Sequence, residues 1–185
     1  MALTVSRKGY GQVEPNHLSA QYTGQIYAQL PAMTAGVGGA AATPIAQLEN
    51  GQFLKYNYAA GRAGVDGDAE WMLVYDEEKL YDERRQNHKD FAMKANEMAD
   101  KTLYPRLLKT NIGDLLTTNT FAGAASGPDA SVTGPSLAVG NYLTISNAGW
   151  LTKSDSKPES GIVFQVVKEY NLADMQPAVK IQRIQ

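Results

Sequence analysis

The clearest structural signal lies near the end of the chain, in the stretch Val139-Gly140-Asn141-Tyr142-Leu143-Thr144-Ile145-Ser146-Asn147-Ala148-Gly149-Trp150-Leu151-Thr152. Two runs rich in apolar residues and threonine, which favour strands, flank the three turn-forming residues Asn147-Ala148-Gly149. A three-residue loop that contains glycine is typical of a β-hairpin. We therefore predict an antiparallel hairpin here.

A similar pattern occurs earlier in the chain. Ile112-Gly113-Asp114-Leu115-Leu116-Thr117 resembles Val139-Gly140-Asn141-Tyr142-Leu143-Thr144, because each has an apolar residue, a Gly-Asp or Gly-Asn pair and then a strand that contains threonine. Glycine permits a sharp bend, and an Asp or Asn side chain can accept a hydrogen bond from its own backbone. Corners of this kind recur in small β-barrels, so the repeat favours a small β-barrel or a sandwich.

Other segments extend the β pattern. Phe53–Tyr58 alternates in polarity after Asn50-Gly51, a pair suited to a type I′ turn. Trp71–Tyr75 is a continuous apolar run of strand length, which predicts burial on both faces. Gly161–Tyr170 and Ala178–Ile184 are predicted as the last two strands. In contrast, the Gly-, Ala-, Ser- and Pro-rich stretch Ala122–Ser136 predicts an exposed loop.

The only highly charged region is 76–101. Its residues Leu80, Arg84, His88 and Phe91 are spaced by three or four, which allows at most one short helical insertion. The predicted fold class is therefore mainly β, a small β-barrel or sandwich, with an extended N-terminal arm.

The arm is predicted from residues 1–44. Gly9–Leu30 is polar and Gln-rich and shows neither helical nor strand periodicity, and residues 31–44 are nearly all small and lie between two prolines. We predict an extended arm with a Gly/Ala-rich strap at 1–44 and a β-rich body at 45–185. Because the arm is too poor in side chains for a core, we expect the body to fold without it.

Composition narrows the function. The 185 residues include 17 Lys and Arg against 19 Asp and Glu, which gives a net charge of −2, and they include two histidines and no cysteine. The near-zero charge argues against a nucleic-acid partner, and no stretch approaches the roughly 20 apolar residues of a membrane span. Without cysteine there is no thiol nucleophile and no disulfide. We expect no enzymatic activity, no cofactor and no metal.

Four groups of residues suggest chemistry, and each has a simpler structural explanation. Gly36–Gly39 lacks the Gly-Lys-Ser/Thr of a phosphate-binding loop. Asp66–Glu70 does not have the spacing of a calcium-binding loop and suits a solvated turn. The carboxylates of Asp76–Arg85 lie among arginines, as on a solvated face or in a salt bridge between subunits. His88 has no serine nucleophile in a Gly-x-Ser-x-Gly motif to activate.

The tyrosines of the arm point to a partner. Tyr10, Tyr22 and Tyr27 have no core within the arm to join, and tyrosine combines a large apolar area with a polar tip, which suits interfaces. The predicted partner contacts are Tyr10, His17, Tyr22, Ile26 and Tyr27.

Several segments resemble small structural proteins of tailed-bacteriophage heads. The resemblance is carried by Gln12–Gln21, Thr23–Pro31 and Leu48–Tyr56, and it continues at Lys89–Phe91 and Gly113–Asn119. It implies a capsid decoration, or cement, protein on the virion exterior, which binds the lattice of the major capsid protein and stabilises it, with sister copies as further partners. Such proteins have no catalytic residues, so none is carried over.

Other functions stay open from the sequence. A head-fibre base or a tail component belongs to the same broad class of virion proteins. From a different class, a carbohydrate-binding β-module would use Trp71 or Trp150 as a platform for a sugar ring. A hydrolase is the third alternative, and it would need two buried carboxylates that face one cleft.

Overall fold

The computed structural model describes residues 2–13, 26–34, 41–75, 92–94, 104–122, 131–172 and 174–185. The regular structure within these ranges is entirely β, and they hold no helix that could span a membrane. The strands are β1 (Leu3–Lys8), β2 (Ile26–Gln29), β3 (Met33–Thr34), β4 (Thr43–Pro44), β5 (Gln47–Glu49), β6 (Phe53–Asn57), β7 (Arg62–Gly64), β8 (Trp71–Val74), β9 (Ala92–Lys94), β10 (Arg106–Leu108), β11 (Leu115–Thr118), β12 (Ser131–Leu137), β13 (Tyr142–Ile145), β14 (Leu151–Ser154), β15 (Phe164–Asn171) and β16 (Pro177–Arg183).

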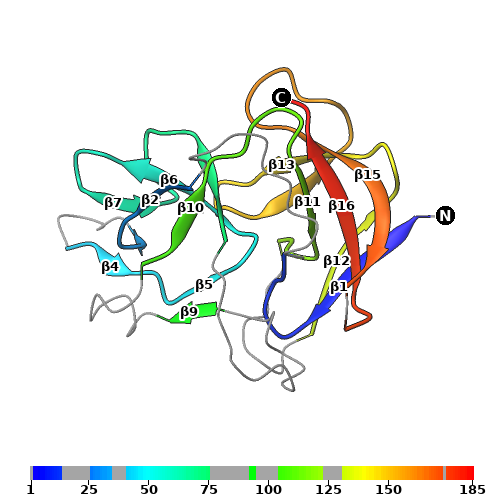
Figure 1. The fold of residues 1–185 in the computed structure, drawn as a ribbon, viewed down its shortest axis with the longest axis horizontal. Helices are drawn as coiled ribbons and strands as arrows, with labels where there is room; N and C mark the ends of the chain where they lie inside the picture. Colours follow the sequence, from blue (N-terminus) through cyan, green and yellow to red (C-terminus); the bar gives the residue numbers. More distant parts are fainter. Residues whose placement is uncertain are drawn as a thin grey trace.

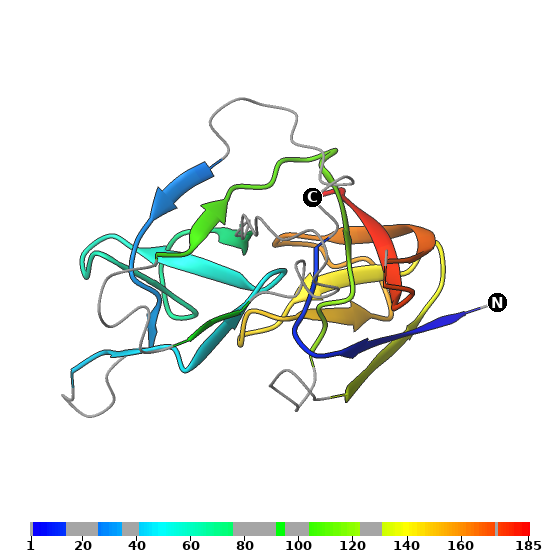
Figure 2. The same cartoon turned by 60° about the horizontal axis from the view of Figure 1, so that its bottom comes forward.

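Two five-stranded sheets form most of the molecule. The first sheet has the strand order β2-β10-β8-β6-β7, and the second has the order β11-β16-β15-β13-β14. The pairs β1-β12, β3-β4 and β5-β9 form smaller two-stranded sheets. The two large sheets lie side by side, and β1 runs along β12 beside the second sheet (Figures 1 and 2). The described strands form no closed barrel. The prediction of a mainly β fold is therefore confirmed, and the arrangement of the sheets is sandwich-like.

Successive residues of a strand point to opposite sides of a sheet, and the central strands of the first sheet, β6 and β8, place apolar residues on both sides. Phe53 and Leu73 point into a core shared with the second sheet, where the ring centroids of Phe53 and Phe164 are 5.7 Å apart. Leu54 and Met72 point into a second apolar cluster on the other side. The predicted burial of both faces of the run at 71–75 is confirmed across Met72–Val74.

The predicted hairpin is confirmed as β13 and β14. Ile145 lies opposite Leu151, and beyond that pair Ser146 N donates to Trp150 O at 2.8 Å. The three residues between Ser146 and Trp150 form the loop, which Gly149 N closes by donating to Ser146 O at 2.9 Å. The hairpin loop also contacts the first sheet, since Phe53 N donates to Gly149 O at 2.8 Å.

This contact makes Gly149 intolerant of a side chain. Its φ is +81°, and an added Cβ would lie 2.2 Å from Phe53 O. We expect Gly149→Ala to lower the free energy of unfolding by about 3 kcal/mol, from left-handed backbone strain together with overpacking. Gly161→Ala is the matched control, because its φ is +86° and nothing lies within 4 Å of an added Cβ. Urea denaturation should show the larger loss for Gly149→Ala, and equal losses would contradict the contact.

Two local predictions are corrected. Among the described residues Gly51 has a positive φ, of 89°, and Asn50 does not, while Gln52 N donates to Glu49 O at 3.2 Å. This is the pattern of a type II turn and not of type I′, which needs a positive φ at both positions. The loop predicted at 122–136 is wrong in its last part, because Ser131–Leu137 forms β12, which pairs with β1.

The described residues of the predicted arm are extended, but they belong to the packed structure. Val5 and Val13 lie in the core shared by the two sheets, and β2 pairs with β10 at the edge of the first sheet. This contribution to the core argues against the expectation that the body folds without the arm, an expectation that deletion of the segment would test. Sequence reasoning did not anticipate this contribution because the apolar partners of Val5 and Val13 come from distant strands. The division of the chain at residue 44 stays a prediction.

Candidate interaction site

Two turns lead into the second sheet in the same way. The first corner turn, Asn111–Asp114, precedes β11. Asp114 N donates to Asn111 O at 3.0 Å, and Asn111 N donates to the Asp114 carboxylate, Oδ2, at 2.8 Å. Gly113 takes a φ of 97°, which lets the chain reverse between the two ends. Backbone and side chain therefore close the turn together, because the Asp114 carboxylate accepts from the backbone at the start of the turn.

The second corner turn, Ala138–Asn141, precedes β13 and repeats this geometry. Asn141 N donates to Ala138 O at 3.0 Å, and Ala138 N donates to Asn141 Oδ1 at 2.9 Å. Gly140 takes a φ of 92°. The repeat found in the sequence is therefore a repeat in the structure, with an asparagine oxygen in place of the aspartate oxygen.

Both corner turns bind the neighbouring strand by the same three hydrogen bonds. The glycine N–H donates to a main-chain carbonyl of the strand, and a main-chain N–H of the strand donates to the main-chain carbonyl of the Asp or Asn. A glutamine side chain of the strand donates to the main-chain carbonyl of the glycine. In the first turn these are Gly113 N to Arg183 O at 2.8 Å, Arg183 N to Asp114 O at 2.9 Å and Gln182 Nε2 to Gly113 O at 3.3 Å. In the second they are Gly140 N to Val166 O at 2.8 Å, Val166 N to Asn141 O at 2.9 Å and Gln165 Nε2 to Gly140 O at 3.4 Å.

Each corner turn carries an exposed apolar side chain. Ile112 is 66% exposed and Val139 is 62% exposed, and they occupy the same position of their turns. An isolated exposed apolar residue is ordinary on a protein surface. Here, however, two of them stand on equivalent turns, and five hydrogen bonds hold each turn in place. These two side chains are the strongest candidates for contacts with a partner.

A buried polar network joins the N-terminal segment to the turn at residues 49–52. Arg7 Nη1 pairs with Glu49 Oε2, and their side chains are 1% and 3% exposed. Gly11 N donates to the same oxygen at 2.7 Å, and Gln47 Nε2 donates to Glu49 Oε1 at 2.9 Å. The guanidinium of Arg7 also lies 5.2 Å from the ring centroid of Trp150. We call this set of contacts the N-terminal polar network.

The segment continues along β11. Gln12 N donates to Asn119 Oδ1 at 2.9 Å, and Thr118 Oγ1 donates to Gln12 O at 2.7 Å. Val13 then forms an isolated antiparallel bridge with Thr118. Gln12 and Val13 thus run along β11, the edge strand of the second sheet, and are held there by backbone and side-chain hydrogen bonds.

The predicted partner contacts fall in different places. Tyr10 is half-buried and lies in the chain between β1 and the residues that hydrogen-bond to β11. Ile26 and Tyr27 belong to β2, at the edge of the first sheet, where Ile26 lies opposite Leu108. His17 and Tyr22 lie outside the described residues. The structure therefore does not gather these five residues into one described surface.

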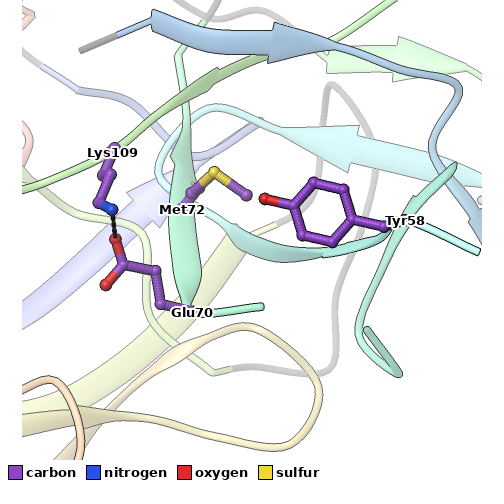
Figure 3. A pocket seen from close by; sticks show the side chains of 4 residues that line it. All are labelled: Tyr58, Glu70, Met72 and Lys109. Atoms are coloured by element: carbon purple, nitrogen blue, oxygen red, sulfur yellow. Dashed lines mark ion pairs between the residues drawn. The ribbon is translucent and has the colours of Figure 1, made fainter. Parts of the chain in front are cut away.

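A small hollow lies where the first sheet meets its loops. It is lined by Tyr58, Glu70, Met72 and Lys109, and Lys109 Nζ lies 3.0 Å from Glu70 Oε1 (Figure 3). Its volume of about 130 Å³ is well below the several hundred Å³ of typical small-molecule sites.

Burial lowers the pKa of the nearby Arg183, and the charges of Glu70 and Asp114 oppose that shift.

The groups weighed for chemistry do not assemble into a site in the described ranges. Asp66 pairs with Arg62, with Oδ1 at 2.9 Å from Nη1, and this hydrogen bond holds the pKa of Asp66 below its usual value. No set of three potential metal ligands occurs among the residues that the structure describes. His88 and the acidic cluster at 76–83 lie outside those residues.

Both tryptophans considered as sugar platforms have a cation over the ring. Lys55 Nζ lies 4.6 Å from the ring centroid of Trp71, and Arg7 covers Trp150. Both rings are only partly exposed, and Trp71 packs against the shared core. A sugar ring needs an accessible aromatic face, so these contacts do not favour the carbohydrate-binding alternative.

Sequence reasoning did not select Ile112 and Val139 as contact residues, although the repeated corner pattern marked their positions. Comparison of the chain with protein-family models, with curated proteins and with solved structures found no match. We therefore infer a function from the sequence resemblance and from the geometry of these surfaces.

Proposed function

We propose that this protein is a structural virion protein that decorates the outer surface of a tailed-bacteriophage capsid. Its partners are the major capsid protein and, on the lattice, sister copies of itself. The observation that carries the proposal is the pair of corner turns, each of which holds an exposed apolar side chain on a hydrogen-bonded support. Apolar anchors that do not move on binding lose little conformational entropy, which favours docking onto another protein.

The resemblance to phage-head proteins indicates the class of partner, which is a capsid protein. The corner turn at Asn111–Asp114 lies within the stretch that carries the last part of that resemblance, Gly113–Asn119. A sandwich of short strands with tight turns also suits a cement protein, since such a protein stabilises its partners through contacts and not through chemistry. The head-fibre and tail alternatives use the same kind of surface and differ in location.

The test is co-sedimentation with capsids. The full chain is mixed with capsids assembled from the major capsid protein of the same phage genome, and pelleted protein is measured as the chain concentration rises. We expect saturable binding and a higher melting temperature of the capsids, because a ligand that binds only the assembled state stabilises it. The chain without capsids should stay in the supernatant. Recovery with tail fractions only would favour the tail alternative, and no binding to either would refute a virion role.

A further inference from the structure

The second sheet contains a local two-fold axis. Gln165 of β15 and Gln182 of β16 lie directly opposite each other, with Phe164 opposite Arg183 on one side of this pair and Val166 opposite Ile181 on the other. A two-fold rotation perpendicular to the sheet at this pair exchanges β15 with β16 and β13 with β11. The rotation also exchanges the two corner turns, together with the hydrogen bonds that each turn makes. The four strands therefore form one approximately symmetric unit.

The outward face of this unit shares the symmetry. Leu115, Gln182, Gln165 and Tyr142 follow one another in register across the four strands, and each is partly exposed. A residue adjacent to each of these four along its strand is buried in the shared core. Because neighbouring residues of a strand point to opposite faces, this row points away from the core. The buried residues are Leu116, Ile181, Phe164 and Leu143.

The two exposed apolar side chains lie at opposite ends of this four-stranded unit. Neighbouring strands in the unit are antiparallel, so β11 and β13, the two outer strands, run in opposite directions. The turns that precede them therefore lie at opposite ends of the sheet, with Ile112 on one and Val139 on the other. A partner that contacts both side chains must extend across the whole unit.

We propose that this face docks across the junction of two identical partner subunits related by a two-fold axis, with Ile112 and Val139 each entering the same pocket on one of the two subunits. Two similar side chains in similar surroundings can fit two identical pockets. Two identical subunits related by a two-fold axis present a pair of identical pockets at their junction. The proposal rests on the proposed function, in which these subunits are copies of the major capsid protein. It adds that the chain binds at two-fold junctions of the lattice.

The experiment compares three variants of the full chain in the capsid binding assay: Ile112→Asp, Val139→Asp and the double variant. Loss of a buried apolar anchor at an interface corresponds to roughly thirtyfold weaker binding. We expect both single variants to lose about this factor, within threefold of each other, and the double variant to lose binding at accessible concentrations. Met175→Asp is the matched control, since Met175 is 73% exposed but lies on neither corner turn, and it should bind like the unmodified chain.

Stoichiometry gives the second measurement. At saturation we expect about one chain for every two capsid subunits, because each two-fold junction accommodates one symmetric unit. Circular dichroism and thermal unfolding establish that each variant is folded, which is expected because both side chains are exposed. A loss confined to one of the two variants, or a ratio of one chain per subunit, would refute docking across two subunits.

Two further outcomes separate this proposal from the proposed function. If the unmodified chain binds capsids but all three variants bind equally well, the corner turns are not the contact and only this inference fails. If the unmodified chain does not bind capsids, the proposed function fails and this inference fails with it. Concentration-dependent dimerisation of the free chain that both aspartate variants abolish would assign the face to a second copy of the chain, against the proposal.

Discussion

A chain that lacks residues 1–13 will not form the native fold. The deletion removes β1, which pairs with β12, and it removes Val5 and Val13 from the shared core. It also leaves the buried carboxylate of Glu49 without Arg7 and without the N–H of Gly11. Burial of the two valines contributes about 1.5–3 kcal/mol each, and an unpaired buried charge costs about 3–5 kcal/mol. Together these losses are comparable to the whole stability of a typical domain.

The measurement is thermal unfolding followed by circular dichroism, in which the truncated chain should show no cooperative transition. A chain that lacks only Met1 and Ala2 is the control, because Ala2 is exposed and precedes β1. The control should melt like the full chain. A cooperative transition of the truncated chain within about 5 °C of the full chain would mean that the segment is a removable arm after all.

Glu49→Ala is expected to destabilise the protein by about 3–5 kcal/mol, because it leaves Arg7 charged and buried. The carboxylate of Glu49 accepts from Arg7, Gly11 and Gln47, and the side chains of Arg7 and Glu49 are almost fully buried. Arg7 Nε and Nη2 have no hydrogen-bond partner among the described residues, so Glu49 is the group that compensates its charge there. For a chain of this size the loss corresponds to a melting temperature lower by about 6–20 °C.

Glu70→Ala is the matched control for this prediction. Glu70 also pairs with cations, with Lys109 at 3.0 Å and with Arg183 at 3.9 Å, but the Glu70 side chain is 36% exposed, and an exposed pair contributes at most about 1 kcal/mol. The double variant Arg7→Met with Glu49→Leu should recover much of the stability, because no charge is then buried alone. Equal losses for Glu49→Ala and Glu70→Ala in urea denaturation would contradict the role of the N-terminal polar network.

The sequence by itself determined the local geometry of the second sheet. The hairpin loop before Trp150 and the two corner turns are each closed by contacts between residues at most four positions apart, such as Asn111 with Asp114 and Ala138 with Asn141. Such contacts form from the residue types themselves, because glycine accepts a positive φ and an Asp or Asn oxygen reaches its own backbone. The burial of Met72–Val74 was predictable for a similar reason, since a continuous apolar run has no polar face to turn toward water.

Only the tertiary structure decided how distant segments combine. Arg7 and Glu49 are charged residues that a local pattern assigns to the surface, and their burial depends on a partner 42 positions away. β1 pairs with β12, and β5 pairs with β9, which lies within the charged region at 76–101. The two-fold arrangement of the corner turns likewise depends on the pairing of β15 with β16. Long-range strand pairing is set by which apolar surfaces remain to be covered once the sheets pack, and no local pattern of residues contains that information.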